Sequence, residues 1–198
     1  MNDSERAALH GETLCRVAAN AMRYGLEHNA APIISAAGFP EALRVPRASF
    51  VTLEENGELR GCIGSVAARR PLVEDVGENA YGAGFRDPRF RPIEERAWNH
   101  LTVAISVLGA FETLTCADEN ELFRQARPGI DGFVISAGGH RGLFLPQVWD
   151  TLRTPRVFFD TLREKAGLPR HYWSPQLRIE RFTVTSIPKR AVSDLAAV

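Results

Sequence analysis

Cysteine is scarce in this sequence, and its placement argues against domains that depend on cross-links or on structural zinc. Cys15, Cys62 and Cys116 are an odd number of thiols, and none of them belongs to a CxxC pair. Neither these cysteines nor the histidines show the spacing of zinc ligands. We therefore predict three free thiols in a reducing cytoplasm, with no disulfide framework and no metal site.

A long apolar run and an excess of one charge are also missing. No stretch approaches the roughly 20 apolar residues that a membrane-spanning helix requires, and no signal peptide precedes the cysteines, since the first residues of the sequence are polar. Lys+Arg and Asp+Glu both total 24, so the formal net charge is zero. We expect a cytoplasmic protein with neither a membrane nor a nucleic acid as partner, although AARRPL and FRDPRFRP could form local basic patches.

The signature motifs of several common enzyme classes are absent as well. The sequence contains no GxxxxGK[ST] phosphate loop, no GxSxG elbow, no HExxH pair and no CxxxCxxC cluster. These absences remove most of the support for a nucleotide-binding protein, a serine hydrolase or a metalloprotease. No cofactor is predicted.

The residues that are present indicate a globular chain of mixed helix and strand. Of its 198 residues, 44% are hydrophobic and 24% are charged, which is ordinary for a soluble domain. In the first half, the apolar spacing and the Asn56-Gly57 turn signal predict these elements in order: a helix at Glu5–Leu26 capped by Ser4, strands at Ser49–Glu54 and Glu58–Ser65, a helix that starts at Pro71, and a strand at Leu101–Leu108.

The second half repeats this order of elements. ENELFRQA predicts a helix, IDGFVISAGGHRGLFLPQV a hairpin that turns at Gly138-Gly139, TPRVFFDTLREKAGL a helix, and LRIERFTVTSIP one closing strand. The two series suggest two α-β-β-α-β units and an old duplication. We predict an α+β fold in which helices cover mainly antiparallel sheets, with residues 1–198 as one domain. Its subdomains would be 1–112 and 113–198, and they need not be continuous.

The stretch LRGCIGS, at Leu59–Ser65, is the segment with the most chemical interest. Alternation along a strand places Arg60 and Cys62 on one face, roughly 6–7 Å apart, where a guanidinium would favour the thiolate. Gly61 and Gly64 leave space for a ligand or for another backbone. The segment therefore fits two interpretations: a nucleophilic Cys62 with Arg60 as activator or anion binder, or a small apolar residue in a closely packed strand. No histidine lies nearby in the sequence to act as its base.

A second segment of interest is FRDPRFRPI at residues 85–93, which two prolines make rigid. Asp87 can bond the backbone amides of its own turn, and Arg89 can pair with it. The two interpretations are a structural turn with an ion pair, or a loop that brings Asp87 and Arg89 to the edge of a cleft beside Cys62.

The second half offers two further candidates. Gln147, which follows a proline, can fix backbone amides or bind a ligand. The tract PRHYWSP, at residues 169–175, could form a lid over a small molecule or an aromatic plug over the core. Asp131, between two glycines, is most simply a turn residue.

Six stretches occur in the order and spacing of a known family. They are LRGCIGS, DPRFRPI, ISVL, GIDGFVI, RGLFLPQV and REKAGL. Over about residues 13–185 the chain resembles the AMME-syndrome candidate-region (AMMECR) domain family, whose hallmark is LRGCIG. Within that family it looks like the type called AmmeMemoRadiSam system protein A, a name that reflects neighbouring genes for a Memo-like protein and a radical S-adenosylmethionine enzyme.

The resemblance implies a two-subdomain α+β fold with the hallmark in or near a cleft between subdomains, but it supplies no established reaction. The hallmark and the two candidate segments discussed above together give the predicted ligand- or partner-binding residues. They are Arg60, Gly61, Cys62, Ile63, Gly64, Asp87, Arg89 and Gln147. We expect a cytoplasmic binding or adaptor module that works with Memo-like and radical S-adenosylmethionine partners and holds a small molecule or peptide. The alternative is a thiol-dependent enzyme. Arg163 stands where the family often has a cysteine, which weakens any scheme with a second thiol there.

Overall fold

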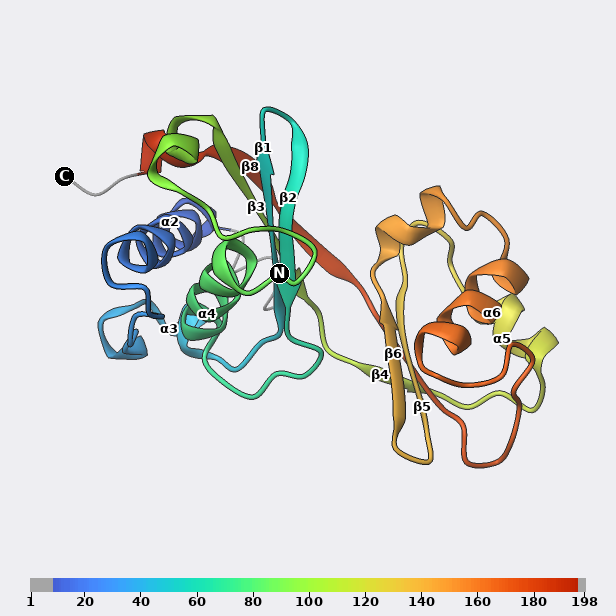
Figure 1. Cartoon of the computed structure of the whole chain (residues 1–198). Coiled ribbons are helices and arrows are strands. Elements are labelled where there is room, and N and C mark those ends of the chain that lie inside the picture. The colour runs from blue at the N-terminus through green and yellow to red at the C-terminus, as the bar shows by residue number, and fades with distance from the viewer. Residues whose placement is uncertain (1–8, 196–198) are drawn as a thin grey trace. The chain divides into compact units, whose positions relative to one another are not determined.

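The computed structural model describes residues 9–195, which form two units (Figure 1). The first unit comprises residues 9–108 and 185–195, and the second comprises residues 109–184. The first unit is therefore discontinuous, because the end of the chain returns to it. The sequence had placed the division at residues 112 and 113 and left this continuity open. None of the helices in residues 9–195 is both long and apolar enough to cross a bilayer.

The first unit is a four-stranded sheet with helices on one face. Its strands, in the spatial order β2-β1-β3-β8, are β2 (Glu58–Gly64), β1 (Ser49–Glu55), β3 (Leu101–Leu108) and β8 (Val184–Ala191). Its helices are α2 (Gly11–His28), α3 (Glu41–Arg44) and α4 (Leu72–Phe85), with 3-10 helices at Ala36–Gly38, Glu95–His100 and Val192–Leu195. Helices α2 and α4 lie together against the sheet (Figure 1), and their apolar faces form one core with the inward residues of β1 and β3.

Helix α2 and the first hairpin confirm two predicted elements in outline. The described helix begins at Gly11, whereas the predicted Ser4 cap and the predicted first turn lie outside the described residues. The hairpin turns at Asn56 and Gly57, which both have positive φ angles (54° and 86°), as a two-residue turn between right-twisted strands requires. Core residues alternate with outward-facing residues along β1.

The second unit is another four-stranded sheet with an aromatic core. Its strands, in the order β4-β7-β5-β6, are β4 (Glu112–Leu114), β7 (Arg178–Phe182), β5 (Gly132–Ala137) and β6 (His140–Phe144). Its helices are α5 (Glu119–Gln125) and α6 (Pro155–Lys165), with a 3-10 helix at Pro146–Asp150. Trp149 stacks on Phe158 at 3.8 Å between ring centroids, and Phe133 meets both rings edge-on.

The closing segment of the chain corrects one prediction. LRIERFTVTSIP was expected to form one strand, but it forms β7 and β8, which separate at Thr183 and join different sheets. The two sheets then match strand for strand, as β2-β1-β3-β8 and β6-β5-β7-β4. Each α-β-β-α-β series is completed by a strand that follows the other series, since β4 comes after β3 and β8 comes after β7. Each sheet therefore has one more strand than the predicted α-β-β-α-β series supplies, and that strand comes from the segment after the other series.

A buried polar cluster ties the start of α4 to the first hairpin. Asp75 Oδ2 accepts hydrogen bonds from the backbone N–H (2.9 Å) and the hydroxyl (2.7 Å) of Ser49, and Oδ1 accepts one from the Ser65 hydroxyl (2.6 Å). Asn79 Nδ2 donates to Asp75 Oδ2 (2.9 Å) and to the Ser49 carbonyl (3.0 Å). Asp75 is 1% exposed. The cluster therefore fixes both outer ends of the hairpin that carries Cys62.

We expect Asp75→Ala to lower the free energy of unfolding by about 3 kcal/mol, because it leaves the buried Ser49 N–H and both serine hydroxyls without their acceptor. Asp75→Asn should be milder, because the amide keeps the shape and one acceptor oxygen. Urea unfolding measures the free energy of unfolding of both variants. An alanine variant as stable as the asparagine variant would contradict this role.

The same residue predicts a pH dependence. Burial raises the pKa of Asp75, and this effect outweighs the hydrogen bonds from Ser65 and Ser49 and the charge of Arg70, which act in the opposite direction. The stabilising contribution is full below the ordinary carboxyl value of about 3.9 and is lost as the pH rises through the raised pKa. Relative to the wild type, Asp75→Asn should therefore gain stability between about pH 4 and about pH 8 in urea unfolding. If the difference in stability between Asp75→Asn and the wild type stayed the same over this pH range, Asp75 would have the same pKa in the folded and unfolded chains, which would contradict the prediction.

Candidate functional site

Cys62 lies in an edge strand, on the sheet face that points away from the helices. It pairs with Thr52 of β1, whose neighbours Val51 and Leu53 point into the core. The Thr52 hydroxyl lies 3.3 Å from the Cys62 sulfur. The thiol is half-buried. Because Ala104 of β3 pairs with Thr52 from the other side, the three side chains form a row across one face of the sheet.

The open edge of β2 at Cys62 is closed by Asp87 and Arg89. The Cys62 N–H donates to Asp87 Oδ2 (2.9 Å), and Arg89 Nη2 donates to the Cys62 carbonyl oxygen (3.3 Å). These are the two backbone groups that a further strand would use. The pair therefore takes the place of a neighbouring strand at this one residue and holds the Cys62 peptide in position. We call these three residues the Cys62 clamp.

Asp87 and Arg89 are themselves tightly joined. Arg89 donates from Nε to Oδ1 (2.9 Å), from Nη2 to Oδ2 (2.6 Å), and from its backbone N–H to Oδ1 (3.1 Å). Asp87 is 5% exposed. The hydrogen bonds from Arg89, followed by the one from the Cys62 amide, hold the pKa of Asp87 well below its usual range despite its burial. The segment thus combines the Asx turn and the ion pair with a position beside Cys62.

At Gly61 and Gly64 of the motif, neighbouring groups fill the space that a side chain would take. A Cβ on Gly61 would lie 2.1 Å from the carbonyl oxygen of Ala83, so α4 approaches the strand as closely as the missing side chain permits. A Cβ on Gly64 would lie 2.2 Å from the ring of Phe50, its cross-strand partner. Of the two uses predicted for this space, the structure shows another backbone at Gly61 and an aromatic ring at Gly64. Ile63 packs against the core between them.

Arg60 occupies an irregular position in the hairpin. Leu53 pairs with Gly61 and Glu54 pairs with Leu59, so a bulge leaves Arg60 without a cross-strand partner. Its Nε donates to Glu55 Oε2 (3.2 Å) and its Nη2 donates to the carbonyl oxygen of Pro92 (3.1 Å). Within the described part of the chain, the guanidinium that bonds to Cys62 is the one of Arg89.

Two other residues that the sequence singled out lie in the second unit. Gln147 is exposed on the 3-10 helix Pro146–Asp150, whereas the other predicted site residues all belong to the first unit. Arg163 is 1% exposed, with Nη1 3.0 Å from Asp160 and Nη2 2.8 Å from Glu119. It replaces the expected thiol with a buried ionic network that joins α5 to α6.

Neither of the remaining thiols lies at the Cys62 clamp. Cys15 is buried in the first core, where desolvation raises its pKa to about 11. Cys116 belongs to the second unit. Among residues 9–195 no three His, Cys, Asp or Glu side chains converge as they would around a metal ion.

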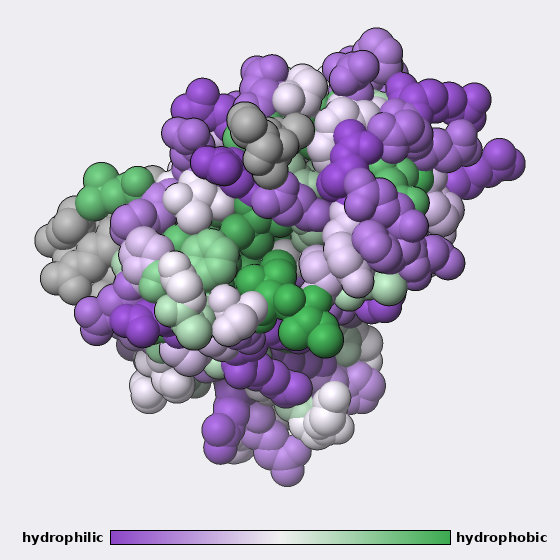
Figure 2. Space-filling view, turned by 90° about the vertical axis from the view of Figure 1, so that its left-hand side faces the viewer, coloured by the Kyte–Doolittle hydropathy of each residue, from purple (hydrophilic) through white to green (hydrophobic). Residues whose placement is uncertain are grey.

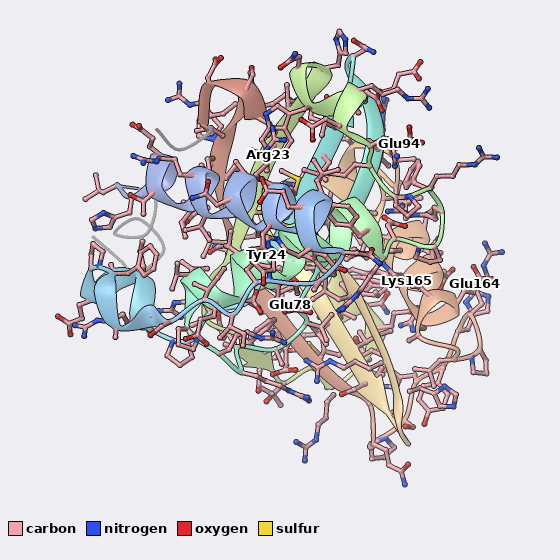
Figure 3. All side chains as sticks on the ribbon, turned by 60° about the vertical axis from the view of Figure 1, so that its left-hand side comes forward. Arg23, Tyr24, Glu78, Glu94, Glu164 and Lys165 are labelled. Carbon is pink, nitrogen blue, oxygen red and sulfur yellow. The ribbon has the colours of Figure 1, made fainter. Side chains whose placement is uncertain are left out.

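The first unit also carries an apolar hollow of about 240 Å³ beside α2. Tyr24 of α2 lines it together with Ile34 and Phe39. Arg23 leaves the helix on a different side (Figure 3), where it pairs with Glu95 at 2.6 Å. On the face that Figure 2 shows, apolar residues (green) gather near the middle among hydrophilic ones (purple). The hollow beside α2, at about 240 Å³, suits one apolar side chain better than a whole small molecule.

Comparison with known proteins identifies the family. The AMMECR1 family model matches residues 15–187. The chain belongs to the AMMECR1 family. A protein of Methanothermobacter thermautotrophicus is 37% identical in an alignment of 149 positions that covers 72% of this chain and 76% of that protein. A protein of Aeropyrum pernix is 37% identical in an alignment of 172 positions that covers 82% of this chain and 71% of that protein.

The fold of this AMMECR1-family chain is also similar to that of a solved structure. The crystal structure of the uncharacterized protein PH0010 from Pyrococcus horikoshii aligns with a TM-score of 0.80 at 30% identity, and the alignment covers 91% of this chain and 95% of that one. The predicted AMMECR domain and the α+β class are confirmed.

Proposed function

We propose that this AMMECR1-family chain is a binding module of adaptor type, and that its binding surface is the sheet face around Cys62. The observation that carries the proposal is the surroundings of the thiol. Its hydrogen-bond partner among the described residues is the Thr52 hydroxyl, while Asp87 and Arg89 are engaged with the Cys62 backbone.

These surroundings suit recognition better than nucleophilic catalysis. A thiol nucleophile is activated by an adjacent general base or by a cation that stabilises the thiolate. A threonine hydroxyl is not a base near neutral pH. The Arg89 guanidinium is already neutralised by Asp87 in a two-point pair. Both groups instead fix the strand, and a rigid strand presents its side chains in a constant arrangement.

The chemistry of this sheet face supports a peptide or an uncharged small molecule as its ligand. On the Glu54 side of Cys62, this face carries a carboxylate that is paired with Lys189. On the Gly64 side, the half-buried side chains of β1 and β3 are Phe50, Thr52, Ala104 and Ser106. They are small or aromatic and uncharged, with hydroxyl groups that can orient a ligand.

We further propose the AmmeMemoRadiSam system protein A type, with a Memo-like protein and a radical S-adenosylmethionine enzyme as partners in the cytoplasm. The order and spacing of the six family stretches support this assignment. The partners would then contact the first unit, since its edge strand carries the family hallmark.

The test measures the affinity of the immobilised chain for the purified Memo-like protein and radical S-adenosylmethionine enzyme of its own organism. Ala104→Arg, which adds a long cation beside Thr52, should weaken binding at least about tenfold, whereas Cys62→Ser should stay within about twofold of the wild type. Ala68→Arg, on an exposed residue, is the matched control. If Cys62→Ser lost binding while Ala104→Arg bound as the wild type does, the proposed binding surface would be wrong. If the wild-type chain bound neither protein, the proposed partners would be wrong.

The second candidate function is a thiol-dependent enzyme with Cys62 as nucleophile. The observation that favours it is the position of Arg89, whose Nη2 donates to the carbonyl oxygen of Cys62 at 3.3 Å and places a guanidinium at the same residue as the thiol. Arg89 would then take the activating role that the sequence had given to Arg60. This function requires a native thiol that reacts readily with small electrophiles.

A further inference from the structure

A hollow of about 430 Å³ opens in the second unit where β4 and β7 stop pairing. The last pair of the ladder is Leu114 with Ile179, and beyond it the two segments diverge. The apolar residues that line the hollow include Leu114, Leu177 and Ile179, and Trp173 lies beside them. The volume lies within the range of sites that hold whole small molecules, which is roughly 300–1,000 Å³.

The polar groups of this hollow are all neutral. Thr115, Cys116 and Ser174 contribute them, and no charged residue is among the described residues that line the space. The Ser174 hydroxyl is fixed, because it donates to the Tyr172 hydroxyl (2.8 Å) and accepts from the backbone N–H of Gln176 (3.2 Å). The site can therefore orient a ligand by hydrogen bonds but offers no counter-ion for a charged one.

The electrostatic surroundings disfavour an anion in particular. Burial raises the pKa of the Cys116 thiol, and the negative charges of Glu121 and Asp118 raise it further. Glu121 lies close by, since its Oε2 accepts the backbone N–H of Ala117 at 2.7 Å. The thiol thus stays protonated at neutral pH, and the same carboxylates would repel a negatively charged ligand.

Trp173 gives the hollow its selectivity for shape. It is half-buried, whereas Trp98 and Trp149 are buried in the two cores. It packs against the aromatic core of the second unit and also lines the hollow. An indole held in this way offers a flat surface to another ring. The tract PRHYWSP is therefore both a plug over the core and one wall of a cavity.

We propose that this hollow binds an uncharged planar aromatic molecule, stacked on Trp173 and oriented by the hydroxyls of Thr115 and Ser174. The site is separate from the sheet face around Cys62, because every residue that lines it belongs to the second unit. It adds a small-molecule site to a chain whose proposed role is protein binding, and it does not depend on that role.

The test is a titration of the full chain with indole, followed through the three tryptophan indole N–H signals in nitrogen–proton correlation spectra. The Trp173 signal, assigned by Trp173→Phe, should shift saturably, while those of Trp98 and Trp149 stay in place. Indole-3-acetate, the anionic analogue, should bind at least about tenfold more weakly than indole. Tryptamine, the cationic analogue, should bind no more weakly than the anion.

Ala117→Phe fills the hollow from an exposed position, and it should abolish the shift without unfolding the protein. Ala68→Phe, exposed in the first unit, is its matched control and should bind indole as the wild type does. A Trp173 signal that does not saturate with indole, an anion that binds as tightly as indole, or an unchanged affinity in Ala117→Phe would each overturn the proposal.

Discussion

Gly61→Ala should lower the free energy of unfolding by about 3 kcal/mol or more, a large effect for one added methyl group. The new Cβ would lie 2.1 Å from the carbonyl oxygen of Ala83. That oxygen belongs to the backbone of α4, so no side chain can rotate away, and the helix itself must move off β2. Because α4 is also tied to the hairpin through Asp75, such a movement strains both contacts.

Urea unfolding of Gly61→Ala and of a matched control measures this effect. Gly38→Ala is the control, since a Cβ there would meet nothing within 4 Å and the residue has no positive φ angle. It should change the stability by less than about 0.5 kcal/mol. A Gly61→Ala variant as stable as this control would show that α4 does not approach β2 as described.

Asp87→Ala should cost about 3 kcal/mol, because it removes a buried carboxylate that accepts four hydrogen bonds and leaves the Cys62 N–H without its partner. The Cys62 clamp also predicts a local readout. Hydrogen exchange at the Cys62 amide should become faster in the variant than the loss of global stability alone explains.

The pH dependence of Asp87→Ala has the opposite sign from that of Asp75→Asn. Because Arg89 lowers the pKa of Asp87, its contribution is full above the ordinary carboxyl value and is lost as the pH falls through the lowered one. The stability gap between the wild type and Asp87→Ala should thus be largest near neutral pH and should shrink in acid. Asp150→Ala, on an exposed residue, is the control. A gap below about 1 kcal/mol near neutral pH, with unchanged exchange at Cys62, would contradict the clamp.

Local signals in the sequence were enough to predict the first hairpin but not its register. Asn56 and Gly57 have the φ angles that their residue types favour, so the turn follows from chemistry within two residues. A regular hairpin closed there would pair Cys62 with Val51. The bulge beside Glu54 shifts the pairing so that Cys62 meets Thr52, and no local pattern marks a bulge of this kind.

Long-range contacts decided what the sequence left open. Cys62 and Asp87 are far apart in the chain, so the residues themselves could not show which donor the carboxylate would accept from. The space at Gly61 could have served a ligand or a backbone. The run Gly82–Ala83–Gly84 in α4 was the signal that favours a backbone, because small residues let a helix approach a strand.

The division of the last predicted strand has a similar explanation. Residues 178–188 continue the pattern of a strand without a break, so nothing local shows that β7 and β8 join different sheets. Their separation at Thr183 depends on the pairing of β8 with β3, which lies far back in the chain. The order of helices and hairpins, in contrast, depends on local periodicity and was predictable.

The measurement that tests the central claim most directly is the rate of iodoacetamide labelling of each thiol in the native protein, resolved by peptide mass spectrometry over a range of pH. If Cys62 is a fixed part of a binding face, it should label slowly in the native protein near pH 8.5 and more slowly still near pH 7, because the thiolate is the form that reacts with iodoacetamide. Cys15, buried in the first core, should not label until the protein unfolds. Fast labelling of Cys62 that is nearly unchanged between these pH values would contradict the account and would favour the thiol-dependent enzyme.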